Sequence, residues 1–283
     1  MEVATDIRQI SIGDVEYPQS LREIADPPPI LYVRGNLNWG ELEVVAVVGT
    51  RKPTSYGTQV ATQLVEAIAR NCVIVSGLAY GIDSVAHRAS VKVGGITVAV
   101  LGTGIDDASI YPAENRGLAQ EILKNGGALI SEYPPLSEPL KHHFPQRNRI
   151  IAGLSQKIVV IEAGEGSGAL ITAKLGLDYN REVLAVPGPV TSPMSMGPNS
   201  LIAEGAKPVL YPSDVVEISV QKIQTDLTEV EQIVYNTLVS QTRTADEITQ
   251  ITGLKAAEVN TIITLLEMKG VIMNTGAGGF SIK

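Results

Sequence analysis

The sequence predicts an α/β protein, in which a mostly parallel sheet lies between two layers of helices, and a small C-terminal domain follows. Short apolar runs such as residues 44–48 (VVAVV) alternate with segments of helical periodicity along most of the chain. Strands that are apolar on both faces are typical of a parallel sheet with both sides covered. Beyond residue 225 the pattern becomes three helices and a hairpin, which indicates a second domain.

Residues 1–40 come first, and prolines at positions 18 and 27–29 favour an extended path and exclude helix there. We expect an extended lead-in segment packed on the core. From residue 41, the expected strands cover residues 44–48, 73–75, 96–102, 128–130, 158–161 and 183–186, with a last short unit near 209–210. The helical stripes between them include residues 60–68, 85–89, 118–123 and 170–175. Residues 41–220 are therefore predicted to form a Rossmann-like, doubly wound domain that binds its ligand at the carboxyl ends of the strands.

Residues 225–283 are predicted to form a winged helix-turn-helix domain. Thr228 with Glu231 and Thr244 with Glu247 have the spacing of capping boxes, and each opens a helix. A third helix over residues 259–268 and a hairpin around residues 276–279 complete the pattern. The domain has four basic and seven acidic residues, a balance of −3. Because a helix that reads a DNA groove usually presents Arg or Lys to phosphates, contact with a protein is at least as consistent with this domain as duplex binding.

Composition excludes several kinds of site and several classes of protein. A single cysteine, Cys72, excludes an internal disulfide and a multi-cysteine zinc site. No apolar run reaches the ~20 residues that a membrane span needs, and the first residues lack the pattern of a secretory signal. We expect a cytoplasmic protein without a membrane span. The net charge of −8 argues against attraction of the whole molecule to nucleic acid, although local charge can differ.

The stretch from Phe144 to residue 154 (FPQRNRIIAGL) combines an aromatic residue, two arginines and the start of a helical apolar stripe. At 100° per residue, Arg147 lies on the apolar face and Arg149 nearly opposite. A guanidinium on a buried face needs an anionic partner, which could be a carboxylate or a phosphate. The neighbouring His142 and His143 are predicted to be solvated loop residues and not metal ligands.

Known catalytic and cofactor motifs do not match. The loop after the first strand (Gly49-Thr50-Arg51) is not G-x-G-x-x-G, and the sequence has neither a P-loop nor a G-x-S-x-G elbow. No cofactor, metal or catalytic residue is expected. Asp83 and His87, four residues apart on one helix, are interpreted as a helix-stabilising ion pair.

The loops at the carboxyl ends of the predicted strands contain residues that suit an anion instead. Arg51 follows the first strand at a predicted helix N-terminus, and Ser167-Gly168 opens another helix, where free backbone N–H groups attract phosphate. Lys174 lies one to two turns into that helix. With Arg147, these residues indicate a phosphate-lined pocket in which Phe144 can stack on a base.

The sequence resembles the DNA-processing protein A (DprA, also called Smf) family. Residues 76–87 read SGLAYGIDSVAH and residues 144–154 read FPQRNRIIAGL, and further matches follow in order from about residue 17 to 214. The other matching stretches are residues 48–51, 56–57, 111–116, 131–134, 167–173, 187–188 and 197–206. Many members begin with a helical domain, whereas this sequence starts almost directly at the lead-in segment.

The resemblance implies a binding protein and not an enzyme. Family members bind single-stranded DNA, form homodimers through the Rossmann-like domain and load the recombinase RecA onto the strand in natural transformation. Single-strand binding protein is implied as a further partner of some members. Carried over by motif, the DNA-binding residues would be Gly49, Arg51, Ser76, Gly77, Lys141, Phe144, Arg147, Asn148, Ser167, Gly168 and Lys174.

Two alternatives remain. One is a nucleotide-processing enzyme of the phosphoribohydrolase-like Rossmann group, whose P-G-G-x-G-T-x-x-E signature would fall on residues 162–171 (EAGEGSGALI), where the last glutamate is absent. The other is a scaffold that makes its protein contacts through the winged helix, which is compatible with DNA binding.

Overall fold

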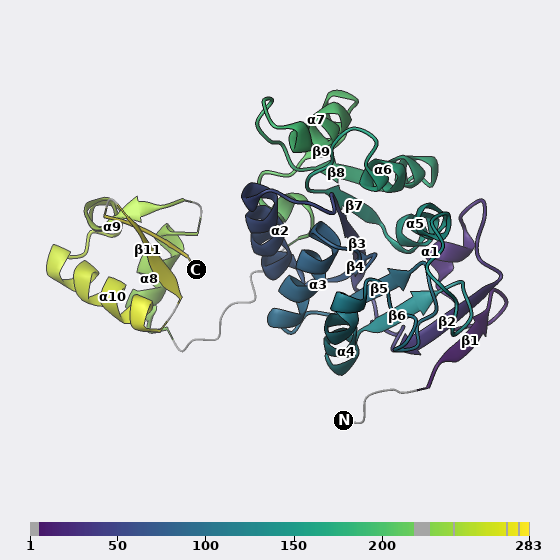
Figure 1. Ribbon diagram of the computed structural model, residues 1–283. Helices are drawn as coiled ribbons and strands as arrows, with labels where there is room; N and C mark the ends of the chain where they lie inside the picture. Colours follow the sequence, from purple (N-terminus) through teal and green to yellow (C-terminus); the bar gives the residue numbers. More distant parts are fainter. Residues whose placement is uncertain (1–5, 218–226, 240, 270, 277, 283) are drawn as a thin grey trace. The chain divides into compact units, whose positions relative to one another are not determined.

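A computed structural model describes residues 6–217, 227–239, 241–269, 271–276 and 278–282 (Figure 1). The chain forms two compact units that divide at residues 218 and 219. The expected boundary between residues 220 and 225 lies outside the described residues. No described helix has both the length and the apolar character that crossing a membrane requires.

The first unit contains a nine-stranded sheet in the order β1-β2-β6-β5-β4-β3-β7-β8-β9. Its strands are β1 (Arg8–Ser11), β2 (Ile30–Gly35), β3 (Glu43–Val48), β4 (Cys72–Ser76), β5 (Thr97–Leu101), β6 (Ala128–Ser131), β7 (Lys157–Val160), β8 (Glu182–Ala185) and β9 (Lys207–Pro208). From β6 to β9 all neighbours are parallel, whereas β1 and β2 are antiparallel additions at the edge. The predicted mostly parallel, doubly wound α/β fold is confirmed.

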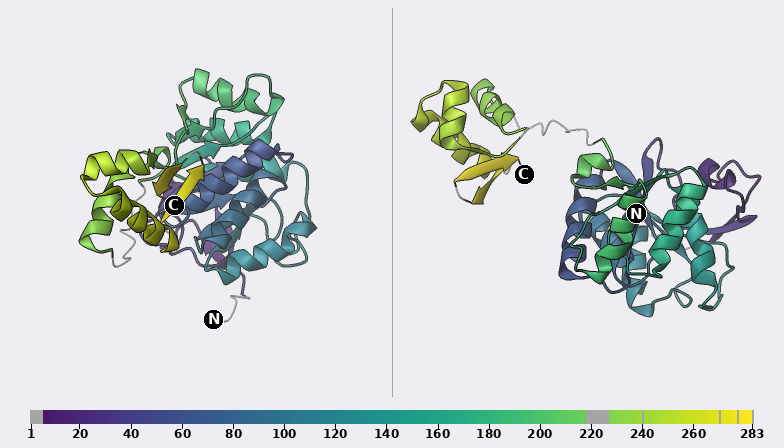
Figure 2. Two further views of the ribbon diagram at one scale, coloured as in Figure 1. Left: turned by 90° about the vertical axis from the view of Figure 1, so that its left-hand side faces the viewer. Right: turned by 90° about the horizontal axis from the view of Figure 1, so that it is seen from above.

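Helices cover both faces of the sheet. On one face lie α2 (Ser55–Ile68), α3 (Ile82–Lys92) and α4 (Arg116–Lys124), which the left view of Figure 2 shows side by side. On the other face lie α1 (Gln19–Arg22), α5 (His143–Leu154), α6 (Gly168–Asp178) and α7 (Met196–Ala203).

Strand β3 shows why the apolar runs form this layered core. Val44, Ala46 and Val48 pack with the α5 and α6 side, and Val45 and Val47 pack with the α2 and α3 side. Since successive side chains of a strand point to opposite faces, a strand between two helical layers must be apolar at every position.

The lead-in segment differs from expectation. It is part of the sheet, because β2 pairs with β6 and buries Leu31 and Val33, and β1 pairs with β2. The prediction that its prolines exclude helix is wrong: α1 begins directly after Pro18, which occupies the N-cap position. Proline is tolerated at a helix start because the first backbone N–H groups have no intrahelical acceptor there.

The strand order creates a crevice at β3. After β3 the chain adds β4, β5 and β6 on one side, and α5 then carries it across to β7 on the other side. Val48 of β3 is the register partner of Val160 of β7, so the loops that follow these two strands start next to each other. Ligands of open α/β sheets bind at such a reversal of strand order.

The second unit contains α8 (Glu229–Thr237), α9 (Ala245–Thr252) and α10 (Ala256–Met268) with a three-stranded sheet. Both predicted capping boxes are present, and α9 ends at Gly253, whose φ of 70° is left-handed. The hairpin strands are β11 (Ile272–Gly276) and β12 (Gly279–Ile282). The sequence did not indicate β10 (Arg243–Thr244), which pairs with β12, because a two-residue strand carries no periodicity.

Candidate functional site

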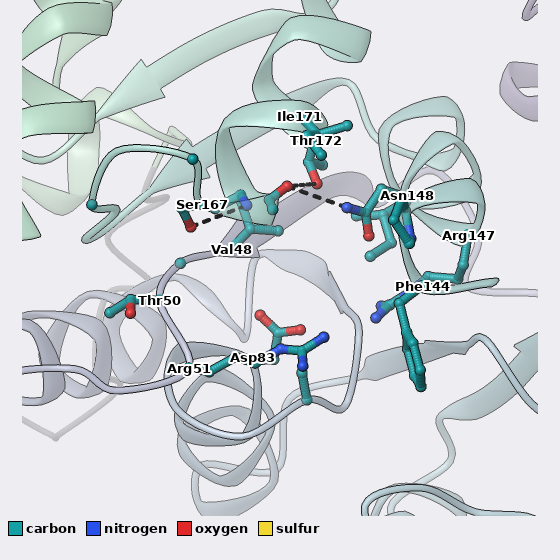
Figure 3. Close-up of a pocket in the computed structure, with 18 of the residues that line it drawn as sticks. Val48, Thr50, Arg51, Asp83, Phe144, Arg147, Asn148, Ser167, Ile171 and Thr172 are labelled. Carbon is teal, nitrogen blue, oxygen red and sulfur yellow. Dashed lines mark hydrogen bonds between the residues drawn. The ribbon is translucent and has the colours of Figure 1, made fainter. Parts of the chain in front are cut away.

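A pocket of about 830 Å³ opens where the loops after β3 and β7 meet the N-terminal ends of α5 and α6 (Figure 3). Most of the predicted site residues line it: Gly49, Arg51, Lys141, Phe144, Arg147, Asn148, Ser167 and Gly168. A pocket of this size is in the range of small-molecule and cofactor sites. Most of the residues that the sequence predicted for a binding site therefore gather at one pocket.

Three predicted residues do not line the pocket. Lys174 is exposed on α6, and its side chain makes no ion pair among the described residues. Ser76 is buried, and its hydroxyl donates to the carbonyl of Val47 at 2.7 Å. Gly77 acts indirectly, because a Cβ there would lie 1.6 Å from Nη1 of Arg147. The absent side chain of Gly77 thus makes room for Arg147.

Arg147 is the most unusual side chain of the pocket. It is only 3 % exposed, and its Nε and Nη1 are buried without a hydrogen-bond partner. Asp83 also lines the pocket. Among the described residues, its carboxylate does not form an ion pair with Arg147. Burial lowers the pKa of Arg147 to about 10, the charge of Asp83 opposes this shift and that of Arg51 adds to it. Arg147 is therefore still charged at neutral pH and offers its N–H groups to a ligand.

The predicted ion pair between Asp83 and His87 is wrong. Asp83 accepts a hydrogen bond from the backbone N–H of Gly77 at 3.1 Å. The Nδ1 of His87 is 2.7 Å from the hydroxyl of Thr97, and burial, with Arg147 and Arg88, lowers the pKa of His87 to about 3. His87 is neutral because this face of α3 packs on the sheet, where a charged imidazole would lose its hydration.

Arg149, two positions after Arg147, has a structural role instead. Its Nη1 and Nη2 donate to the carboxylate of Glu132 at 2.6 and 2.8 Å, and its Nε contacts Asp26 at 3.2 Å. Burial lowers the pKa of Arg149, but the hydrogen bond and charge of Glu132 outweigh this effect and the net shift is upward. The helical geometry thus places Arg149 beside carboxylates, whereas Arg147 has no ion pair among the described residues.

Arg149→Met is expected to lower the free energy of unfolding by about 1–3 kcal/mol, because it leaves the largely buried Glu132 carboxylate without its donors. Single-stranded DNA affinity should stay the same. Urea denaturation followed by circular dichroism measures the first quantity and fluorescence anisotropy the second. An unchanged urea midpoint would show that this ion pair is not structural.

An aromatic surface forms one wall of the pocket. The rings of Phe144 and Tyr111 are 5.7 Å apart and tilted, and the guanidinium carbon of Arg51 lies 5.6 Å from the Phe144 ring centroid. Tyr111 lines the pocket but was missed as a site residue. The available signal was an aromatic residue in a stretch that matches the family, next to a proline. Together these rings offer π-faces on which a base can stack.

Helix α6 points its N-terminus at the pocket. Ser167 is the N-cap, and its hydroxyl accepts from the backbone N–H of Ala169 at 3.4 Å. Asn148 of α5 donates to the carbonyl of Gly168 at 3.2 Å, which holds the two helices in register (Figure 3). The free N–H groups and positive end of the dipole at such a helix start favour an anion.

The loop after β3 holds Arg51 at the pocket, but not at a helix start as predicted. α2 begins at Ser55, after the N-cap Thr54, so Arg51 lies in the loop before it. The N–H of Thr50 donates to the carbonyl of Glu162 at 2.7 Å, and the carbonyl of Thr50 accepts from Ile82 at 3.1 Å. These bonds anchor the base of the loop while the Arg51 side chain is exposed.

The two histidines beside the site lie in different surroundings. His143 is the first residue of α5 and stacks on Tyr133 at 3.8 Å, so its prediction as a solvated loop residue is wrong, whereas His142 is exposed. Among the described residues, no group of three or more His, Cys, Asp or Glu could hold a metal ion. Other lining residues that the sequence did not indicate are Asp83, Glu165, Ile171 and Met194.

Comparison with known proteins identifies the family of the chain. Residues 8–219 match the DNA recombination-mediator protein A family, and residues 221–278 match the DprA winged helix domain. The DNA processing protein DprA of Bacillus subtilis is 45 % identical over 213 residues, covering 75 % of this chain and 71 % of the relative. DprA of Streptococcus pneumoniae is 44 % identical over 206 residues, covering 73 % of this chain and 72 % of the relative.

Solved structures from two species are similar to this chain. The crystal structure of DprA from Streptococcus pneumoniae has a TM-score of 0.70 at 42 % identity, covering 75 % of this chain and 74 % of the other. DNA processing protein A from Helicobacter pylori has a TM-score of 0.66 at 29 % identity, covering 76 % of this chain and 95 % of the other. With its Rossmann-like sheet, its winged helix and these matches, the chain belongs to the DNA recombination-mediator protein A (DprA/Smf) family.

Proposed function

We propose that the pocket at β3 and β7 binds single-stranded DNA. The observation that carries the proposal is Arg147, a buried guanidinium whose Nε and Nη1 have no hydrogen-bond partner among the described residues, beside the α6 N-terminus and the aromatic wall. Leaving a buried charge unpaired is costly, so its retention points to an anionic or carbonyl-bearing ligand. DNA processing protein A of Helicobacter pylori, to which the chain is similar, has a single-stranded DNA binding mode.

The arrangement favours a single strand over a duplex. Phe144 and Tyr111 can stack on a base only if that base has left its neighbours, which is easy in a single strand and costs pairing and stacking in a duplex. Arg51 and Lys141 at the rim and the N–H groups of α6 would hold phosphates. Base stacking and backbone contacts of this kind tolerate many sequences.

We further propose that the bound strand is handed to a recombinase. The family description is that of a recombination mediator, and loading of RecA onto incoming DNA in natural transformation is the role that fits it. A homodimer would present two such pockets to one strand. Single-strand binding protein is a proposed competitor for the same DNA, and the cytoplasm is the proposed compartment.

The test is fluorescence anisotropy of a labelled oligo-dT and of a matched duplex over a salt series, with wild type and Phe144→Ala. Wild type should prefer the single strand, and the logarithm of its affinity should fall linearly with the logarithm of salt concentration. Phe144→Ala should weaken binding by about 1–3 kcal/mol, the usual value of one base–aromatic stack, with an unchanged salt slope. Equal affinity for both DNAs, or an unaffected variant, would refute the proposal.

The same pocket could be tested for nucleotide chemistry, since Asp83 and Glu165 provide carboxylates in its wall. We propose binding and not catalysis. Release of free base from nucleoside monophosphates, followed by chromatography, would be the result that favours a phosphoribohydrolase-like enzyme.

A further inference from the structure

The second unit has large apolar side chains that are exposed and do not belong to its buried core. Val234, Ile248, Val259, Ile263 and Leu266 are buried in one cluster, which completes the core of this unit. Outside it, Val230 and Ile233 of α8 and Leu265 and Met268 of α10 remain exposed, Met268 at 80 %. Large exposed apolar patches mark interaction surfaces.

One of these exposed side chains, Val230, lines a groove. A depression of about 490 Å³ is bounded by both helices and by the turn between α9 and α10, and its lining residues are Val230, Leu254, Ala257, Glu258, Thr261 and Ile262. Along α10, residues 257, 261, 265 and 268 are three or four positions apart, so they form one stripe that continues from the groove. On α8, Ile233 follows Val230 by one turn.

The charges around the groove do not suit DNA. Helix α10 contains no Arg or Lys, and Lys269, which follows it, donates to Glu231 at 2.7 and 2.8 Å. The charged residues nearest the stripe are Glu258 on α10, Glu229 on α8 and Lys255 at the N-cap of α10, and all three are exposed. A phosphate backbone would meet two acids and a single cation here, whereas groove-binding helices present several cations.

We propose that this α8–α10 surface, defined by Val230, Ile233, Ala257, Thr261, Leu265 and Met268 with Glu229 and Glu258 at its rim, docks a basic amphipathic helix of a partner protein. An apolar helix face would fill the groove, and Lys or Arg beside that face would meet the two glutamates. Exposed methionine suits such a surface because its flexible side chain adapts to the partner. The assignment is independent of the DNA pocket.

The probe is a fluorescein-labelled helical peptide of about 18 residues, long enough for appreciable helix, with Leu at helical spacing and Lys on the flanks. A second peptide has Glu in place of every Lys. Anisotropy with the full chain should show saturable binding of the Lys peptide at low salt and at least tenfold weaker binding of the Glu peptide. Leu265→Ser with Met268→Ser should weaken the Lys peptide at least tenfold.

Charge variants separate docking from general attraction. Glu229→Lys should weaken the Lys peptide, whereas Glu267→Lys, the same charge change on α10 but away from the stripe, should leave it within twofold. Equal binding of both peptides, or no binding, would overturn the proposal. Loss of duplex binding in the double serine variant would also overturn the proposal, because it would assign the surface to DNA. Conversion of a dimer to a monomer by the same variant, measured by sedimentation, would overturn it too, because it would assign the surface to a second copy of the chain.

Discussion

Arg147→Met is expected to weaken single-stranded DNA binding by about 10- to 100-fold without lowering the free energy of unfolding. The affinity loss corresponds to the 1.5–3 kcal/mol of hydrogen bonds to a charged group. The stability should be equal or higher, because methionine fills similar space and removes a buried charge whose Nε and Nη1 have no partner in the described structure. Arg147 would thus strengthen ligand binding while lowering the free energy of unfolding.

Anisotropy and urea denaturation of the same preparations measure the two effects. Lys124→Met is the matched control, because it removes one positive charge from an exposed position at the end of α4, which does not line the pocket. Its DNA affinity should stay near wild type. If Arg147→Met binds normally but unfolds more easily, Arg147 is a structural residue that depends on the charge of Asp83, and the carboxylate interpretation of its partner is right.

Gly77→Ala is expected to reduce the affinity about as much as Arg147→Met, although residue 77 does not line the pocket. The added Cβ would lie 1.6 Å from Nη1 of Arg147 and 2.4 Å from its guanidinium carbon, so the guanidinium must move. Ligand groups that depend on its position would lose their hydrogen bonds, which become weak within a few tenths of an ångström beyond the normal range.

A double-mutant cycle makes this mechanism testable. In combination with Arg147→Met, Gly77→Ala should cost little further affinity, because the flexible methionine can yield where the guanidinium cannot. Gly117→Ala on α4 is the control: a Cβ there meets nothing within 4 Å, and its affinity should not change. Additive losses in the double variant would mean that Gly77 acts through the loop after β4 and not through Arg147.

The sequence was most informative where burial constrains every residue. The predicted strands at 44–48, 73–75 and 183–186 agree with β3, β4 and β8 within one residue at each end, because strands covered on both faces must be apolar throughout. The prolines before β2 argued against a strand there, and β2 could be recognised only from its pairing with β6, about 95 residues later. Antiparallel pairing at a sheet edge depends on that distant partner, and local patterns do not contain it.

The candidate site was predictable to the extent that its residues cluster in three short stretches, residues 49–51, 141–148 and 167–168. The apolar face of α5 correctly placed Arg147 in the interior, but only the structure shows that no carboxylate of the described residues forms an ion pair with it. Lys174 appeared equivalent to the lining residues because it follows Ser167 closely, yet the rotation of α6 leaves it exposed while Thr172 lines the pocket. Tyr111 comes from a distant loop, and its approach to Phe144 is a property of the tertiary fold.

The pairing of β2 with β6 also governs the order of folding during synthesis. Residues 30–35 leave the ribosome long before residues 128–131, with which they pair. Ser20 of α1 must wait still longer for its partners, because its hydroxyl donates to the carbonyl of Leu154 and its own carbonyl accepts from Arg181. The first part of the chain to be translated is therefore expected to be among the last to reach its final place, because a nascent chain that ends before residue 128 holds the apolar strand β2 without its partner β6.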